Sequence, residues 1–125
     1  MTQNSAHIVI ESETVPETEV KAGSGTSMQM LISPESAPNF AMRCFTIKPG
    51  GGMPNHTNEV EHEQYVLGGT AQVGIGDELF TVKKGDVVFI PAGVPHWYEN
   101  SDDGDFRFLC LVPNKPDNIT IINEC

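Results

Sequence analysis

In the second half of the sequence, turn-forming residues divide the chain into short apolar segments, and this spacing limits the fold more than any other feature. Between residues 61 and 112, the separators are Gly68-Gly69, Gly76-Asp77, Lys83-Lys84-Gly85, and the ranges 91–95 and 101–105. Short strands at a spacing of about 8–12 residues with such turns are typical of β-sandwiches and β-barrels. No window of about 12 residues shows the periodicity of an amphipathic helix. We therefore predict an all-β fold.

The sequence predicts one domain over residues 26–125, preceded by an arm. The expected strands are Met28–Ile32, Phe40–Lys48, Glu61–Leu67, Thr70–Ile75, Glu78–Val82, Asp86–Ile90, His96–Asn100 and Phe106–Val112. Pro49-Gly50-Gly51-Gly52 is expected to end the strand that begins at Phe40, because proline and glycine interrupt strands. Residues 1–25 are polar and acidic apart from residues 7–10, so we expect a partly ordered arm with one strand at most. A chain of 125 residues can bury a core without disulfides.

Charge and cysteine content limit the partners and the compartment. Seventeen acidic residues against seven basic ones give a net charge of −10, which repels nucleic acid and anionic membranes. The three cysteines, Cys44, Cys110 and Cys125, are widely spaced and do not suggest a disulfide framework. No secretory signal is apparent at the start, and no apolar run approaches the ~20 residues that cross a bilayer. We expect a cytoplasmic protein that binds neither nucleic acid nor membranes.

Three of the four histidines lie beside turn-rich segments in the second half of the chain. Residues two apart in an extended strand point to the same side. His56 and Asn58 therefore share one direction, and His62 shares a face with Gln64. If both segments line one barrel, the imidazoles of His56, His62 and His96 converge inside it. A single histidine is more often a hydrogen-bonded core or surface residue than a metal ligand, so the spacing alone does not decide between these roles.

Two motifs around these histidines resemble those of a known superfamily. Gly85-x5-Pro91-x-Gly93-x2-His96-x3-Asn100 matches the second conserved cupin motif at every specified position. The segment from Gly50 to Gly69 resembles the first motif, G-x5-H-x-H-x3-4-E-x6-G. His56 stands at its first histidine, and His62 stands where most cupins have glutamate. The chain is thus identified as a member of the cupin superfamily, which implies a double-stranded β-helix, or jelly-roll, barrel.

A narrower resemblance concerns small single-domain manganese-binding cupins, which carry an H-x-H-P-W-E-H motif and four histidine ligands. It covers residues 37–46, 49–51, 61–63 and 108–113. It implies that His56, His62 and His96 hold one divalent transition metal, with manganese favoured and iron, nickel, zinc or copper as alternatives. Asn58 occupies the second ligand position, where it either coordinates through its amide oxygen or leaves the place to water. The resemblance also implies a homodimer.

Other residues are candidates for the walls of a substrate pocket. One face of the strand 106–112 holds Phe106, Phe108, Cys110 and Val112 and suits the inside of a barrel. Our pocket candidates are Arg43, Gln64, Phe108 and Cys110. Trp97 and Tyr98 are expected to pack at the barrel mouth or at a subunit contact. A metal site without a carboxylate ligand favours an anionic small molecule, because the charge of the cation is not compensated.

Three functions remain open at this point, and no catalytic residue is assigned. The first is a small metal-dependent oxidoreductase, similar to a dioxygenase, that acts on an organic acid or a carbonyl compound. The second is a protein that binds a sugar or an organic acid without turning it over. The third is a metal-assisted sugar isomerase or epimerase. Fold alone cannot choose among them, because cupins perform many chemistries on one scaffold.

Overall fold

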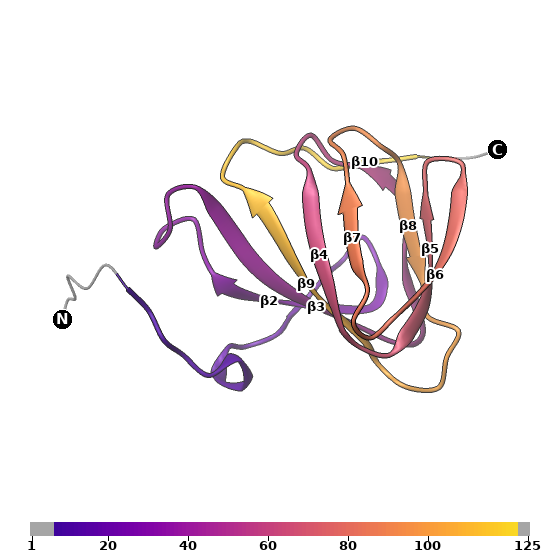
Figure 1. Cartoon of the computed structure of the whole chain (residues 1–125), viewed down its shortest axis with the longest axis horizontal. Coiled ribbons are helices and arrows are strands. Elements are labelled where there is room, and N and C mark those ends of the chain that lie inside the picture. The colour runs from indigo at the N-terminus through magenta and orange to yellow at the C-terminus, as the bar shows by residue number, and fades with distance from the viewer. Residues whose placement is uncertain (1–6, 123–125) are drawn as a thin grey trace.

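The computed structural model describes residues 7–122, and these residues form an all-β structure (Figure 1). A short 3-10 turn at Ser12–Thr14 comes first. The strands are β1 (Thr18–Glu19), β2 (Ser24–Ile32), β3 (Phe40–Thr57), β4 (His62–Gly68), β5 (Thr70–Ile75), β6 (Glu78–Lys83), β7 (Val87–Ile90), β8 (His96–Glu99), β9 (Phe106–Pro113) and β10 (Thr120–Ile121). The predicted fold class is confirmed. Within the described residues, no helix is long and apolar enough to span a membrane.

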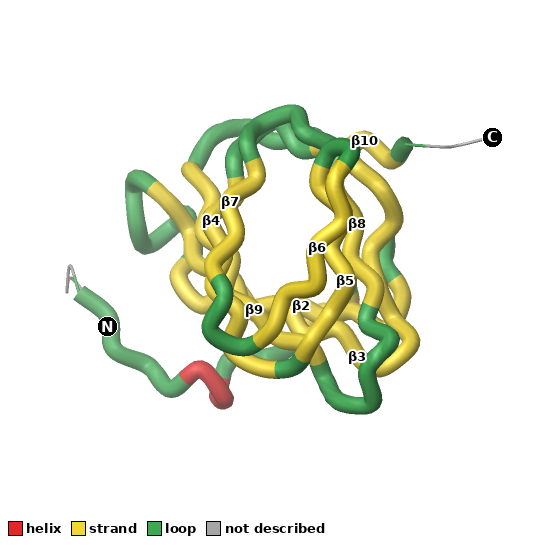
Figure 2. The backbone as a smooth tube through the Cα atoms, turned by 45° about the vertical axis from the view of Figure 1, so that its right-hand side comes forward, coloured by secondary structure: helices red, strands yellow, loops and turns green. Residues whose placement is uncertain are grey.

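The strands form one antiparallel sheet that curls into a barrel. Its order is β6-β5-β8-β3-β9-β4-β7, with β2 and β10 also pairing with β3. In Figure 2, β4 and β7 lie on one side of the curled sheet, and β5, β6 and β8 lie on the other. Neighbours in the sheet are often distant in sequence, as is typical of a jelly-roll.

The longest strand, β3, passes through the segment that was expected to end it. Its first part pairs with β2 and β9, and the part from Gly52 onward pairs with β8. Gly50 adopts a positive φ of 83°, and hydrogen bonds join its backbone and that of Gly51 to Asn100. The prediction of a strand end at Pro49-Gly50-Gly51-Gly52 was therefore wrong. The glycines bend the strand around the corner of the barrel, and the backbone of Asn100 satisfies its hydrogen bonds.

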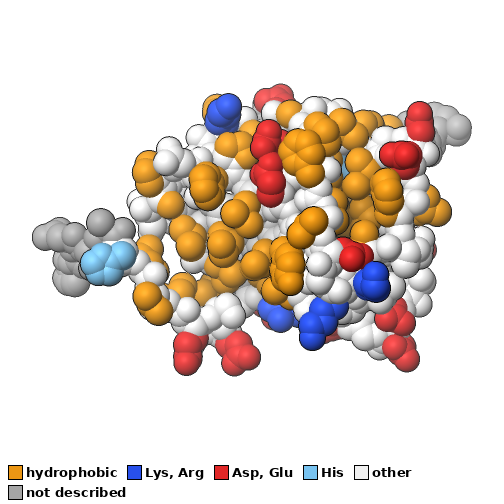
Figure 3. Space-filling view, viewed as in Figure 1, with side chains coloured by type: hydrophobic (Ala, Val, Ile, Leu, Met, Phe, Trp, Pro, Cys, Tyr) orange, Lys and Arg blue, Asp and Glu red, His pale blue; other side chains and the backbone are white. Residues whose placement is uncertain are grey.

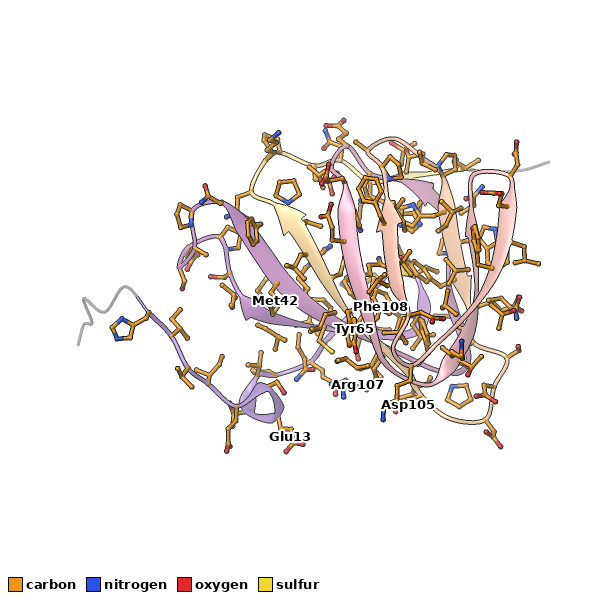
Figure 4. The ribbon with its side chains drawn as sticks, in the orientation of Figure 1. Glu13, Met42, Tyr65, Asp105, Arg107 and Phe108 are labelled. Atoms are coloured by element: carbon orange, nitrogen blue, oxygen red, sulfur yellow. The ribbon has the colours of Figure 1, made fainter. Side chains whose placement is uncertain are left out.

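The apolar core lies between the two sides of the barrel and includes alternate residues of β9. Phe106, Phe108 and Cys110 are buried there beside Val66 and Val73. Arg107 lies between two of these residues in sequence and on the opposite face, where its guanidinium contacts Thr46 and Cys44 (Figure 4). The period of two thus places the predicted face of this strand inside.

The described part of the arm is attached to the outside of the sheet. Residues 1–6 lie outside the described residues, and β1 pairs with β2 through Thr18 and Met28. The side chain of Gln29 donates hydrogen bonds to the carbonyls of Ser12 and Val15, at 2.9 Å each. These bonds fix the 3-10 turn against β2, although the arm itself buries little apolar surface.

Candidate metal centre

Three strands bring His56, His62 and His96 together inside the barrel. His56 lies near the end of β3, directly opposite His96 at the start of β8, and His62 begins β4. The ring centroids of His56 and His96 are 4.2 Å apart, and those of His62 and His96 are 5.5 Å apart. All three side chains are buried. The convergence expected from strand alternation is what the structure contains.

Backbone carbonyls set the orientation of two of the imidazoles. The Nδ1 atom of His56 lies 2.7 Å from the carbonyl oxygen of Pro54, and that of His96 lies 3.0 Å from the carbonyl oxygen of Val94. A carbonyl only accepts hydrogen bonds, so each Nδ1 carries the proton and, in the neutral ring, each Nε2 keeps a lone pair. This is the arrangement in which metal-binding histidines are usually held.

Burial keeps His62 and His96 neutral. It lowers the pKa of His62 from 6.5 to about 3, with the charge of Arg43 as the next cause. It also lowers the pKa of His96 to about 4, against the opposing effect of the Val94 carbonyl. Within the described residues, the Nε2 atoms of both rings are buried and have no hydrogen-bond partner. Such unpaired acceptors are costly, and a bound cation would satisfy them.

The histidines line a cavity of about 270 Å³ that continues into the barrel. Asn58 reaches the same cavity with an amide oxygen that is also buried and has no partner in the described part of the chain. The four predicted pocket residues, Arg43, Gln64, Phe108 and Cys110, all line it. Its apolar wall includes Met28, Phe45, Ile47, Met53 and Phe108.

Polar groups are joined in one network on the inner wall. Arg43 donates from Nη2 to the Sγ atom of Cys110 at 3.3 Å, and its guanidinium lies over the ring of Phe45, 4.9 Å from the centroid. Its Nε atom is buried with no partner among the described residues. Cys110 also lies 3.3 Å from Nδ1 of His62, so the network reaches the histidine cluster. Burial raises the pKa of the Cys110 thiol, which favours its neutral form.

Tyr98 also belongs to this wall, which is not where it was expected. The prediction placed it at the barrel mouth, whereas it is buried and stacks on Phe108 with ring centroids 5.2 Å apart. Gln64 donates to its hydroxyl at 2.7 Å, so the hydroxyl still has its own proton to donate. Burial raises the pKa of Tyr98 and keeps it neutral. The alternation rule contained the signal, because Tyr98 is two residues after His96.

The donor set fits a divalent transition metal, although its geometry is not that of a closed site. Imidazole nitrogens suit manganese, iron, nickel, copper and zinc, and an amide oxygen is acceptable to the harder of these ions. Across residues 7–122, no three His, Cys, Asp or Glu side chains already form a metal-binding group. The fit therefore rests on the buried, unpaired donor atoms.

Comparison with known proteins decides the family. A cupin domain model matches residues 43–112, which is more than half of the chain. The chain is a cupin. An oxalate-binding protein from Thermotoga maritima is 30% identical to this cupin over 118 residues, which cover 90% of this chain and 98% of the relative. The polyketide cyclase RemF from Streptomyces resistomycificus has a similar structure, with a TM-score of 0.87 and 28% identity over 95% of this chain and 87% of that chain.

Another curated relative shares only a part of its length with this cupin. A mannose-1-phosphate guanylyltransferase from Salmonella typhimurium is 37% identical over 68 residues, which cover 53% of this chain and 14% of the relative. These relatives differ in what they bind or transform, so family membership leaves the activity of this chain open.

Proposed function

We propose that this cupin holds one divalent transition metal through His56, His62 and His96 and binds a small carboxylate anion beside it. The observation that carries the proposal is the pair of buried Nε2 atoms, on His62 and His96, that lack a hydrogen-bond partner among the described residues. The burial that keeps these two rings neutral leaves their lone pairs available to a cation. Manganese is favoured by resemblance to the small four-histidine cupins.

The cavity also has donors suited to an anion. A bound dication would supply positive charge for a carboxylate and act as a Lewis acid. Arg43 adds a permanent charge and an unpaired Nε–H, and the hydroxyl of Tyr98 has a proton to donate. The similarity to an oxalate-binding protein over nearly the whole chain supports a small dicarboxylate.

The reaction class remains a hypothesis beyond binding. A dioxygenase-like oxidoreductase that acts on an organic acid or carbonyl compound is our first candidate, and binding without turnover is the second. A metal-assisted sugar isomerase or epimerase is the third, and similarity to part of a guanylyltransferase that uses mannose 1-phosphate favours a sugar ligand. Oxygen uptake with a candidate acid identifies the first, and product formation without oxygen identifies the third.

Elemental analysis of the purified protein tests the metal site. We expect near-stoichiometric metal in the unsubstituted protein and in the control variant His7→Ala, because His7 is exposed in the arm. The His56→Ala variant should lose the metal, since it removes an imidazole that packs against His96. A protein that holds no metal, and whose melting temperature does not change when any of the five metals is added, would refute the site.

Titration of oxalate into the manganese-loaded protein, followed by calorimetry, tests the anion site. The Arg43→Gln variant should bind oxalate about 10-fold more weakly or worse, because a charged hydrogen-bond donor is replaced by a neutral one. Lys48→Gln removes an exposed positive charge outside the cavity and should leave the affinity unchanged. Equal oxalate affinity in all three proteins would show that Arg43 does not bind the anion.

A further inference from the structure

We propose that Asn58 is the fourth metal donor of this cupin and that Asp117 fixes the amide of Asn58 in the orientation that coordination needs. The inference rests on the proposed metal site. Asn58 is only 6% exposed, and it lines the cavity that the three histidines share. Its Nδ2 atom donates to Oδ2 of Asp117 at 3.0 Å. Its Oδ1 atom is buried and has no partner in the described part of the chain.

The carboxylate determines which end of the amide faces the cavity. An ionised carboxylate only accepts hydrogen bonds, so the amide must turn its NH2 group toward Asp117. The carbonyl oxygen is then left as the atom that a cation would meet. In the opposite orientation, the two oxygen-bearing groups would face each other and the NH2 group would face the cation. Asp117 therefore excludes the orientation that cannot bind a metal.

Asp117 is itself held in place by the backbone on either side of the site. Its Oδ1 atom accepts a hydrogen bond from the backbone N–H of Glu59 at 2.6 Å. The backbone carbonyl of Asn58 accepts another from Gly93, at 2.8 Å. These bonds join the turn after β3 to the turn before β8 and to the segment that leads into β10.

The last strand explains how a residue so distant in sequence reaches this position. β10 pairs with the end of β3, where Ile121 lies opposite His56 and Thr120 lies opposite Thr57. This pairing lays the segment before β10 across the top of the barrel in Figure 1. The C-terminal segment thus contributes a group that acts on the metal site through Asn58. Carboxylates that orient metal ligands in this way commonly change metal affinity by about 10- to 100-fold.

A double-mutant cycle on Mn²⁺ and Co²⁺ affinity tests this role. Calorimetry would be performed on the full chain and on its Asn58→Ala, Asp117→Asn and doubly substituted variants. We expect each single substitution to weaken binding about 10-fold, and the double variant to bind no more weakly than Asn58→Ala. Asp103→Asn removes an exposed acidic charge from the loop before β9 and should match the unsubstituted protein.

The form of the cycle separates orientation from simple charge attraction. If Asp117→Asn weakens binding equally in the presence and in the absence of the Asn58 side chain, Asp117 acts by its charge and the inference is wrong. Unchanged affinity in Asp117→Asn would also overturn it. The conservative variant Asn58→His should restore the binding that Asn58→Ala loses, because an imidazole can donate to Asp117 and still present a nitrogen. Failure of that rescue in a variant with the melting temperature of the metal-free parent would contradict a ligand at this position.

The His56→Ala variant distinguishes failure of this inference from failure of the metal site. Loss of metal in His56→Ala, together with unchanged affinity in the Asn58 and Asp117 variants, would overturn only the inference. An unsubstituted protein that binds neither Mn²⁺ nor Co²⁺ would overturn both.

Discussion

His62 and His96 are neutral at pH 7 because the barrel removes their rings from water. Burial lowers the pKa of His62 to about 3 and that of His96 to about 4. In the unfolded chain, both values return to about 6.5. Between pH 4 and 6.5, the unfolded chain therefore binds more protons than the folded one. The free energy of unfolding rises with pH in this window and is lost on acidification.

We expect the metal-free protein to be less stable at pH 4.5 than at pH 7 by an amount on the order of a few kcal/mol. Urea unfolding at the two pH values measures the difference. His62→Gln should reduce it, because that variant no longer has a buried imidazole to protonate there. His7→Ala should leave it unchanged, since His7 is exposed. If His62→Gln had the same pH dependence as the parent, His62 would not be the group responsible.

At the scale of elements, the turn between β4 and β5 depends on one glycine. Gly69 has a positive φ of 83°, and a Cβ atom there would overlap the carbonyl oxygen of Asp105, which precedes β9. The neighbouring Gly68 has open space around its Cβ position and no positive φ. Two adjacent glycines in the same turn therefore have different roles.

We expect Gly69→Ala to lower the free energy of unfolding by about 2 kcal/mol or more, from left-handed strain and overlap together. Gly68→Ala should change it by less than about 0.5 kcal/mol. Urea unfolding of both variants at pH 7 provides the comparison. Equal effects at the two positions would show that the turn does not require the left-handed backbone at Gly69.

At the scale of the whole molecule, apolar and charged surfaces are separated. Hydrophobic side chains gather over the face that carries β2, β4, β7 and β9 in Figure 3, and most of the charged side chains visible there lie at its edges. Phe40, Tyr65, Val87 and Phe89 are among the exposed apolar residues. A homodimer stays a prediction from the family resemblance, as does a cytoplasmic location. The net charge of −10 is consistent with the prediction that nucleic acid is not a partner.

Much of the candidate site could be predicted because strand alternation is a local property. The two-residue period placed Phe108 and Cys110 inside, and it directed His56, His62 and His96 toward one space. The cupin motifs supplied the order of the strands that carry them. The same period would have placed Tyr98 inside, but its position after a proline-rich turn favoured the barrel mouth instead.

By itself, the sequence determined the fold class, the family and the set of inward-facing donors, because turns and alternation are written in adjacent residues. Only the tertiary structure decided how those donors are oriented. Asn58 and Asp117 are far apart in the chain and meet because β10 pairs with β3. Likewise, β3 continues past Gly50 because Asn100 supplies its hydrogen bonds across the sheet. Such contacts depend on strand pairing, which no local pattern specifies.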